Sequence, residues 1–442
     1  MYGAVNIASC AQFLTQDIYF YCKYFYKIEL TVQTNVCSFL LKTSMNTQIQ
    51  KLYDNAGKTE RLIIGLMSGT SMDGLDIALC LVKHSGADTD IKVLAFKTGD
   101  YTDDFRAKIK AVFSKKEVDL QLVCLMNEHI ANTHAQLINE ALQEWGYDNE
   151  SIDFIASHGQ TIFHAPKSLH QLDDYPNGTL QIGDGDHIAL KTGIITLSDF
   201  RQKHLAAGGE GAPLAVYGDY LIFSKAGEDR VMLNIGGIAN FTYLPGSTDA
   251  SAVFSTDVGP GNTLMDQYMQ KYFNRFYDKH AAVGLSGQLN EKLLHALLDC
   301  SFFELDFPKT TGPELFNLEY LSLAQQKSNT ANILKEDVMA TLCHFSARTI
   351  ADAIRRCFGQ EAKAMVYMSG GGMHNPLLVK LLRNELPFCN FLTTDDLNIN
   401  PDAKEAVLFA VLANETLCGR PIDFGNRQGV PAVCMGKISL PA

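Results

Sequence analysis

One short segment concentrates residues that could bind phosphate: Ser68-Gly69-Thr70-Ser71-Met72-Asp73-Gly74. It is flanked by the apolar runs 62–67 and 75–82, and this pattern predicts a hairpin with a polar tip. Backbone amides and hydroxyls in such a tip can converge on phosphate oxygens, and Asp73 is suitably placed to hold Mg²⁺ directly or through water. An ordinary hairpin loop rich in turn-forming residues explains this segment equally well.

Further small-residue turns recur along the chain. They are Gly236-Gly237, Asp257-Val258-Gly259-Pro260-Gly261-Asn262 and Gly370-Gly371-Gly372. Each is expected at the end of an apolar strand, where glycine allows a ligand to approach the backbone closely. Their recurrence favours nucleotide binding over simple chain reversal.

Asp199, in Ser198-Asp199-Phe200-Arg201, is the strongest candidate for a general base. It follows the apolar run 193–198, and α/β sheets bind ligands just past the ends of such strands. A helix N-cap, or a structural pair with Arg201, would explain Asp199 equally well. Ser157 to Thr161 and Gln181 to Gly185 are also expected to follow strands, whereas Asp402, Lys404 and Glu405 fit the charged first turn of a helix.

The elements that must position these residues follow a repeated order. Strands are predicted at 62–67, 75–82, 91–96, 153–157 and 193–198, with helices at 102–115, 118–144 and 213–223. A second set has strands at 230–235, 238–244, 252–256 and 364–369, and helices at 261–275, 286–299, 332–358, 375–386 and 402–418. The repeat predicts two α/β domains of similar plan with a cleft between them.

The amino-acid composition excludes some classes of binding partner. The 442 residues include 37 basic and 49 acidic side chains, a formal net charge of −12, which argues against a nucleic-acid or anionic-membrane surface. The eleven cysteines form no zinc-like cluster and favour reduced thiols in a cytoplasmic protein, and no apolar stretch reaches the ~18 residues of a membrane span.

Residues 1–60 do not match the rest of the chain. We favour the interpretation that the start of translation is placed too early and that Met45 is the actual start. The alternative is an appended segment that packs on the domain or self-associates.

Nine motifs in order resemble those of the anhydro-N-acetylmuramic acid kinases, within the actin/hexokinase/Hsp70-like ATPase superfamily. They are IGLMSGTSMDGLDIAL (64–79), IASHGQTIFH (155–164), LQIGDGD (180–186), SDFRQKHLAAGGEGAPL (198–214), LNIGGIAN (233–240), DVGPGNTLMD (257–266), KTTGPELFN (309–317), SGGGMHNPLL (369–378) and DAKEAVLFA (402–410). The resemblance runs from about residue 61 to the C-terminus. It implies two duplicated actin/hexokinase-like (ribonuclease H-like) α/β domains with the active site between them, one formed by 61–227 with 401–442 and the other by 228–400.

The resemblance also implies a reaction in peptidoglycan recycling. ATP and Mg²⁺ would be the cofactors, water would open the anhydro ring of 1,6-anhydro-N-acetylmuramic acid, and phosphorylation of O6 would give N-acetylmuramic acid 6-phosphate and ADP. A cytoplasmic homodimer is implied as well. The alternatives are a sugar kinase that cleaves no anhydro ring and a non-catalytic nucleotide switch of the actin or Hsp70 type.

Carried over residue by residue, the resemblance makes Asp199 the base that activates water and Glu405 a residue that holds the water and the sugar. The implied phosphate-binding residues are Gly69, Thr70, Ser71, Met72, Asp73, Gly74, Leu75 and Asp76 in the first half, and Gly236, Gly237, Asp257, Gly259, Gly261 and Asn262 in the second. Gly370, Gly371 and Gly372 would face the adenosine.

Overall fold

The computed structural model describes residues 45–69, 72–212, 214–359, 363–425 and 429–442. Two units separate along the chain, Met1–Asp54 and Asn55–Ala442. Helix α2 (Thr47–Ala56) includes their boundary, and every residue of the candidate site lies in the second unit.

The first sheet has seven strands, in the order β12-β6-β4-β1-β2-β3, with β5 paired to β4. They are β1 (Glu60–Ser68), β2 (Gly74–Lys83), β3 (Asp90–Asp100), β4 (Phe154–Ala165), β5 (Gly178–Ile182), β6 (Thr196–Ser198) and β12 (Lys437–Ser439). Strands β1, β2 and β3 form an antiparallel meander, whereas β4 is parallel to β1 and β6 is parallel to β4.

The second sheet repeats this plan with five strands, in the order β11-β10-β7-β8-β9. They are β7 (Arg230–Ile235), β8 (Ile238–Leu244), β9 (Phe254–Pro260), β10 (Met365–Ser369) and β11 (Asn390–Thr393). The meander β7-β8-β9 is antiparallel, and β10 and β11 continue parallel to β7. The order β3-β2-β1-β4-β6 therefore recurs as β9-β8-β7-β10-β11, which confirms the duplicated α/β plan.

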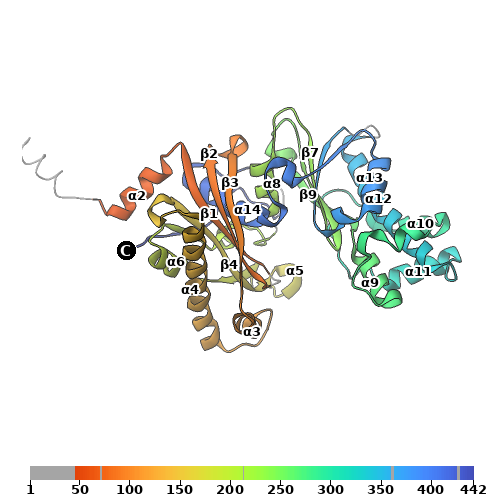
Figure 1. The fold of residues 1–442 in the computed structure, drawn as a ribbon, viewed down its shortest axis with the longest axis horizontal. Coiled ribbons are helices and arrows are strands. Elements are labelled where there is room, and N and C mark those ends of the chain that lie inside the picture. Colours follow the sequence, from red (N-terminus) through yellow and green to blue (C-terminus); the bar gives the residue numbers. More distant parts are fainter. Residues whose placement is uncertain (1–44, 70–71, 213, 360–362, 426–428) are drawn as a thin grey trace, which may run out of the picture. The chain divides into compact units, whose positions relative to one another are not determined.

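Helices accompany both sheets (Figure 1). Those between or after strands of the first sheet are α3 (Asp103–Val112), α4 (Leu120–Trp145), α5 (Lys167–His170), α6 (Gly185–Thr192), α7 (Phe200–Ala206), α8 (Ala215–Phe223) and α14 (Lys404–Cys418). Those within the second half are α9 (Thr263–Phe273), α10 (Glu291–Leu298), α11 (Leu318–Ser328), α12 (Lys335–Phe358) and α13 (Pro376–Glu385).

Helices α4 and α14 cover opposite faces of the first sheet. Ile64 and Leu66 of β1 belong to one buried cluster with Ile130 and Ile138 of α4. Alternate residues of a strand point to opposite faces, and Gly65 points to the other one. There a Cβ atom would lie 1.9 Å from the carbonyl oxygen of Ala406, so glycine is what lets the start of α14 approach β1.

Two stretches expected to follow strands instead lie within them. β4 continues to Ala165, so the segment from Ser157 to Thr161 is strand, because its buried polar side chains find hydrogen-bond partners. β9 continues to Pro260, so Asp257 and Gly259 are strand residues paired with β8 and not turn residues. The sequence also gave no prediction for β5, β11, β12, α5, α6, α7 or α11, most of which are short.

Candidate active site

The predicted phosphate-binding turn begins where β1 ends. The Gly69 carbonyl accepts the backbone N–H of Met72 at 3.4 Å and the Nε2–H of Gln160 at 3.2 Å. Met72 has a φ of 58°, and its side chain is buried in the core of the first sheet. Thr70 and Ser71, also assigned to this turn, lie outside the described residues. The turn is thus held at both Gly69 and Met72.

Two carboxylates follow in the same segment. Asp73 is exposed, and its Oδ1 accepts the Gly74 N–H at 3.2 Å. Asp76 accepts the Thr98 hydroxyl at 2.6 Å. Burial raises the pKa of Asp76, and the charges of Asp73 and Asp402 raise it further, against the lowering effect of the Thr98 hydrogen bond. The neighbouring carboxylates thus concentrate negative charge around Asp76, and such a concentration attracts a cation.

Gly74 and Leu75 have packing roles of their own. A Cβ atom on Gly74 would lie 2.8 Å from the carbonyl oxygen of Gly99, and Leu75 is fully buried in the core. Their places in the motif are therefore explained without a ligand.

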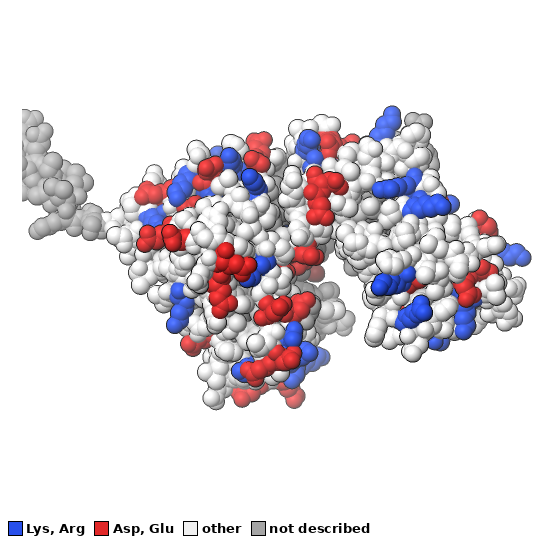
Figure 2. Space-filling model, in the orientation of Figure 1, with Lys and Arg blue, Asp and Glu red and all other residues white. Residues whose placement is uncertain are grey.

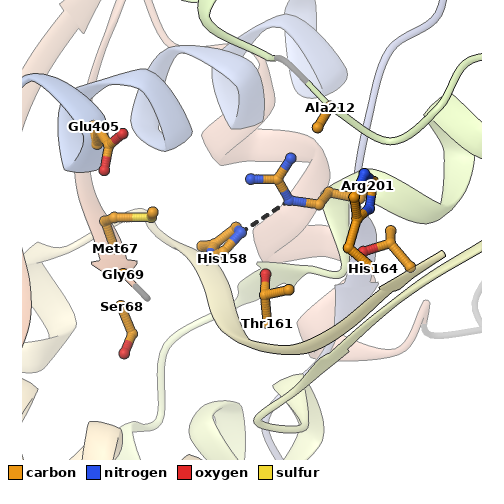
Figure 3. Close-up of a pocket in the computed structure, with 10 residues that line it drawn as sticks. Met67, Ser68, Gly69, His158, Thr161, His164, Arg201, Ala212 and Glu405 are labelled. Carbon is orange, nitrogen blue, oxygen red and sulfur yellow. Dashed lines mark hydrogen bonds between the residues drawn. The ribbon is translucent and has the colours of Figure 1, made fainter. Parts of the chain in front are cut away.

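A pocket of about 420 Å³ opens beside the start of this turn, a size typical of small-molecule sites. It is lined by Met67, Ser68, Gly69, His158, Thr161, His164, Thr179, Arg201, Ala212 and Glu405 (Figure 3). These residues come from β1, β4, β5, α7, α14 and the loop after α7, so the pocket is assembled from segments far apart in sequence.

Arg201 supplies the positive charge of the pocket. Its Nε donates to His158 Nε2 at 3.0 Å, and its Nη1 donates to the Gly211 carbonyl at 2.6 Å. Burial, with the charge of Arg201, holds the pKa of His158 at about 3, so His158 is neutral and accepts the bond. Arg201 forms no ion pair with a carboxylate of the described residues, and its remaining N–H groups are available to an anionic ligand.

Glu405 supplies the carboxylate of the pocket, from the first turn of α14. Burial raises its pKa, Arg201 and Lys404 lower it, and Asp76 raises it. Lys404, the preceding residue, forms a 2.8 Å ion pair with the buried Asp219 of α8, which fixes the start of α14. Figure 3 shows Glu405 and the Arg201 guanidinium on the same side of His158.

Asp199 directly follows β6 of the first sheet but is not among the residues lining the pocket. It follows β6, whose Ser198 pairs with Ser157 of β4, so Asp199 and His158 follow paired positions. Asp199 occupies the N-cap position of α7, as one structural explanation expected, but its side chain makes no capping hydrogen bond. The carboxylate pairs with Lys437 of β12 and not with Arg201, so the expected pair with Arg201 was wrong.

The backbone of Asp199 is unusual. Its φ of 55° and ψ of 45° are left-handed, a conformation that aspartate tolerates but that most residues avoid. Such outliers cluster at functional sites, and this observation leads to the hypothesis that Asp199 acts on a ligand.

In the second half, the small-residue turns lie against one another. The Gly236 carbonyl accepts the Asn262 N–H at 2.8 Å, and the Gly237 carbonyl accepts the Gly261 N–H at 2.9 Å. A Cβ atom on Gly370 would lie 2.8 Å from the carbonyl oxygen of Ile235, the residue before Gly236. Segments that are more than a hundred residues apart in sequence thus form one glycine-rich surface.

The fold requires only some of these glycines. Added Cβ atoms on Gly261 and Gly372 would lie 2.3 Å and 2.2 Å from atoms of neighbouring residues. Gly236, Gly237 and Gly371 have no such neighbour within 3.4 Å, and none of the three has a positive φ. Their lack of a side chain is not explained by packing, which favours close approach of a ligand.

Asp257 is accounted for by internal contacts. Its Oδ2 accepts the Thr311 N–H at 2.9 Å, and burial raises its pKa. Gly259 has a φ of 145° and is packed closely against Phe303 and Thr349. Both residues position the segment that leads to Gly261.

The sequence had not singled out Arg201, His158, His164, Thr161 or Thr179 as site residues. Three of them, Arg201, His158 and Thr161, lie in the polar segments noted around β4 and β6, so the polar character of these segments was a usable signal. His164 ends the motif 155–164, whereas Thr179 carried no signal, because only the pairing of β5 with β4 brings it to the pocket.

Charged side chains of both signs are interspersed over the face shown in Figure 2. Within the described ranges, no helix combines the length and the apolar character needed to cross a bilayer.

Comparison with known proteins identifies the family. A family model described as "Anhydro-N-acetylmuramic acid kinase" matches residues 61–438. The anhydro-N-acetylmuramic acid kinase of Pseudoalteromonas atlantica is 56% identical over 400 residues, covering 90% of this chain and 100% of its own. That of Caldanaerobacter subterraneus is 37% identical over 387 residues, covering 87% of this chain and 98% of its own.

A solved structure of the activator of 2-hydroxyisocaproyl-CoA dehydratase from Clostridium difficile matches 80% of this chain and 95% of its own, with 13% identity and a TM-score of 0.35. The fold assignment rests on the repeated strand order and not on this likeness. With a family model covering most of its length and relatives of this similarity, the chain belongs to the anhydro-N-acetylmuramic acid kinase family.

Proposed function

We propose that this chain uses ATP and water to convert 1,6-anhydro-N-acetylmuramic acid into N-acetylmuramic acid 6-phosphate and ADP. The observation that carries the proposal is the pocket that Glu405 and Arg201 both line beside Gly69, the first residue of the predicted phosphate-binding turn. Family membership supplies the substrate, and the pocket supplies the charged groups that such a substrate needs.

The reaction needs one base. Water attacks C1 of the sugar and gives a proton to the Asp199 carboxylate, while the C1–O6 bond breaks and O6 takes the γ-phosphoryl group. Because O6 is both the leaving group and the phosphoryl acceptor, phosphoryl transfer takes the place of the general acid that a glycoside hydrolase would use. Glu405 holds the water and the sugar from the start of α14.

For this chemistry, Asp199 must face the bound sugar, although it is paired with Lys437 beside the pocket. Lys437 is the more exposed partner, with 63% of its side-chain surface accessible, so the pair is easily exchanged for contacts with ligand and water.

Mg²⁺ fits the carboxylates near the first turn. The described residues contain no cluster of three or more His, Cys, Asp or Glu side chains that could hold a metal ion. Mg²⁺ on a nucleotide, however, usually takes one or two carboxylates, with phosphate and water oxygens completing its shell. Asp73 and Asp76 would supply these carboxylates, and the bound ion would neutralise charge on the phosphates.

Arg201 is proposed to bind the lactyl carboxylate of the sugar. A guanidinium recognises a carboxylate through paired N–H groups, and Arg201 has no carboxylate partner of its own. Glu405 interacts electrostatically with both Arg201 and Asp76, and Glu405 is the carboxylate whose charge acts on the pKa of Arg201. This pattern of interactions supports the proposal that Arg201 acts on the sugar and not on the phosphates.

The nucleotide is proposed to contact glycine turns from both halves. Gly236, Gly237 and Gly371 are open to such contact, because no packing requirement explains them. The two domains are proposed to comprise residues 61–227 with 401–442 and residues 228–400, since α14 packs on β1 of the first sheet. A homodimer in the cytoplasm is expected for the family, and light scattering of the purified protein tests the dimer.

The test is an assay with 1,6-anhydro-N-acetylmuramic acid, ATP and Mg²⁺ in ¹⁸O-labelled water. We expect ADP and sugar 6-phosphate in equal amounts, with one solvent oxygen at C1. Phosphorylation without ¹⁸O at C1 would support the simpler sugar kinase, and nucleotide binding without any sugar product would support the non-catalytic switch.

The carboxylate assignment has its own test. The 1,6-anhydro derivative of N-acetylglucosamine lacks the lactyl group, so the wild type should prefer the muramic substrate. Arg201→Met should lose at least about tenfold of that preference, while a similar loss on both sugars would place Arg201 at the phosphates instead.

A further inference from the structure

Four buried polar side chains form a continuous hydrogen-bond chain that ends at Gly69, where the predicted phosphate-binding turn begins. Tyr101 Oη lies 2.7 Å from His134 Nε2 and donates to Ser68 Oγ at 2.9 Å. Ser68 Oγ donates to Gln160 Oε1 at 2.5 Å. Gln160 Nε2 then donates to the Gly69 carbonyl at 3.2 Å. No more than 3% of any of the four is exposed, and nothing in the proposed chemistry uses His134, Tyr101 or Gln160.

The direction of the chain is determined by its acceptors. Gln160 Nε2 faces the carbonyl oxygens of Gly69 and Thr161, so its amide cannot be reversed without placing oxygen against oxygen. Gln160 Oε1 therefore accepts the only proton of the Ser68 hydroxyl. Ser68 Oγ in turn accepts the only proton of Tyr101.

With its proton committed to Ser68, Tyr101 can only accept from His134. His134 is therefore the Nε2–H tautomer, and its buried Nδ1 has no hydrogen-bond partner. Burial holds the pKa of His134 at about 3, so the imidazole is neutral and the chain keeps one direction across the neutral pH range.

Tyr101 also contacts the far end of the same turn. Its backbone N–H donates to the Asp73 carbonyl at 3.0 Å, while its hydroxyl acts through Ser68 and Gln160 on Gly69. Ser68 and Gln160 are register partners on the parallel strands β1 and β4, so the chain ties the turn to the sheet. One residue, immediately after β3, is thus connected to both ends of the turn.

We propose that His134, Tyr101 and Gln160 are positioning residues that hold Gly69 and Asp73, which flank the predicted phosphate-binding turn, in the arrangement that binds nucleotide. The inference rests on the proposed function, since it takes this turn to be the phosphate-binding one. A purely structural role explains it less well, because apolar side chains would fill this core without leaving His134 Nδ1 unpaired. The hydrogen-bond chain lowers the stability of the core but orients the Gly69 carbonyl in one direction.

The test compares two tyrosines that each lose one buried hydroxyl. Tyr101→Phe breaks the chain but keeps the ring and the backbone bond to Asp73. Tyr217→Phe is the matched control, because Tyr217 is equally buried and its hydroxyl donates to the Pro431 carbonyl at 2.7 Å, outside the pocket. Calorimetric titration of each protein with Mg·ADP, well below the melting temperature, gives the nucleotide Kd.

Tyr101→Phe should raise the nucleotide Kd about three- to tenfold, the scale of one hydrogen bond, and the KM for the sugar by less than about twofold. Tyr217→Phe should lower the melting temperature to a similar extent and leave the nucleotide Kd unchanged. Equal Kd values for Tyr101→Phe and wild type would overturn the proposal.

Gln160→Glu provides a second test with almost no change of shape. It replaces the Nε2–H donor with an oxygen that faces the carbonyls of Gly69 and Thr161, so it should weaken Mg·ADP binding at least as much as Tyr101→Phe. A Gln160→Glu protein that folds and binds Mg·ADP like the wild type would refute the inference. Failure of the wild type itself to bind Mg·ADP would instead refute the proposed function.

Discussion

Replacing Asp199 by Asn separates its chemistry from its place in the fold. Asparagine tolerates the left-handed backbone seen at this position, with φ 55°, about as well as aspartate does. The ion pair with Lys437 is lost, but that lysine is mostly exposed and such pairs contribute about 0–1 kcal/mol. The free energy of unfolding should therefore fall by no more than about 1 kcal/mol.

Turnover should respond much more strongly. Loss of a general base typically costs about 10²- to 10⁴-fold, so Asp199→Asn should fall at least ~10²-fold in kcat. ADP release measured with a coupled assay gives kcat, and Mg·ADP titration checks that the nucleotide site is intact. Urea unfolding of the same samples gives the stability.

Two further substitutions at this position serve as controls for the backbone. Asp199→Gly removes the Cβ that opposes a positive φ and should be at least as stable as Asp199→Asn, yet equally inactive. Asp199→Ala should lose about 1–2 kcal/mol more, the cost of a left-handed conformation for a residue with a Cβ. An Asp199→Asn enzyme within threefold of wild-type kcat would refute the assignment of Asp199 as the base.

Other substitutions test the glycine surface and the pocket charges. Gly371→Ala should fold normally, since the new Cβ has no neighbour nearer than 3.9 Å, and should weaken Mg·ADP binding about tenfold; unchanged binding would remove Gly371 from the nucleotide site. Gly372→Ala should instead lose about 1–3 kcal/mol in urea unfolding, because its Cβ would lie 2.2 Å from Ile235 Cγ2. Arg201→Met should raise the pKa of Glu405 further, since the guanidinium now lowers it. If catalysis needs ionised Glu405, the acid limb of the kcat/KM profile then moves to higher pH, and an unmoved limb would contradict that requirement.

Much of the fold was predictable because its signals are local. Two apolar runs around a small-residue tip predicted the hairpin of β1 and β2, and a change to helical period predicted a helix over 118–144, which is α4 (Leu120–Trp145). The three-residue strands β6 and β12 lie at the limit of this approach, because so short a stretch carries little period of its own. β6 falls at the end of the predicted run 193–198, whereas β12 was missed and is defined by its partner.

For the candidate site, the residues were predictable from the sequence but the contacts between them were not. The sequence singled out Gly69, Asp199 and Glu405 from their motifs, but their relations depend on contacts between distant segments. The carboxylate of Asp199 pairs with Lys437, 238 positions later, and Glu405 shares a pocket with Arg201. Neither contact has a local pattern that could predict it.

The amino-acid sequence by itself determined the family, the repeated α/β plan and the motifs that hold the functional groups, because strand period, turn chemistry and motif order are properties of neighbouring residues. Only the tertiary structure decided which groups meet. It placed Arg201 on neutral His158, left Gly371 open while Gly372 is packed, and connected His134 to Gly69 through three buried side chains. The charge state, burial and hydrogen-bond direction of a side chain depend on neighbours that the fold brings together. They could therefore be assigned only from the three-dimensional structure.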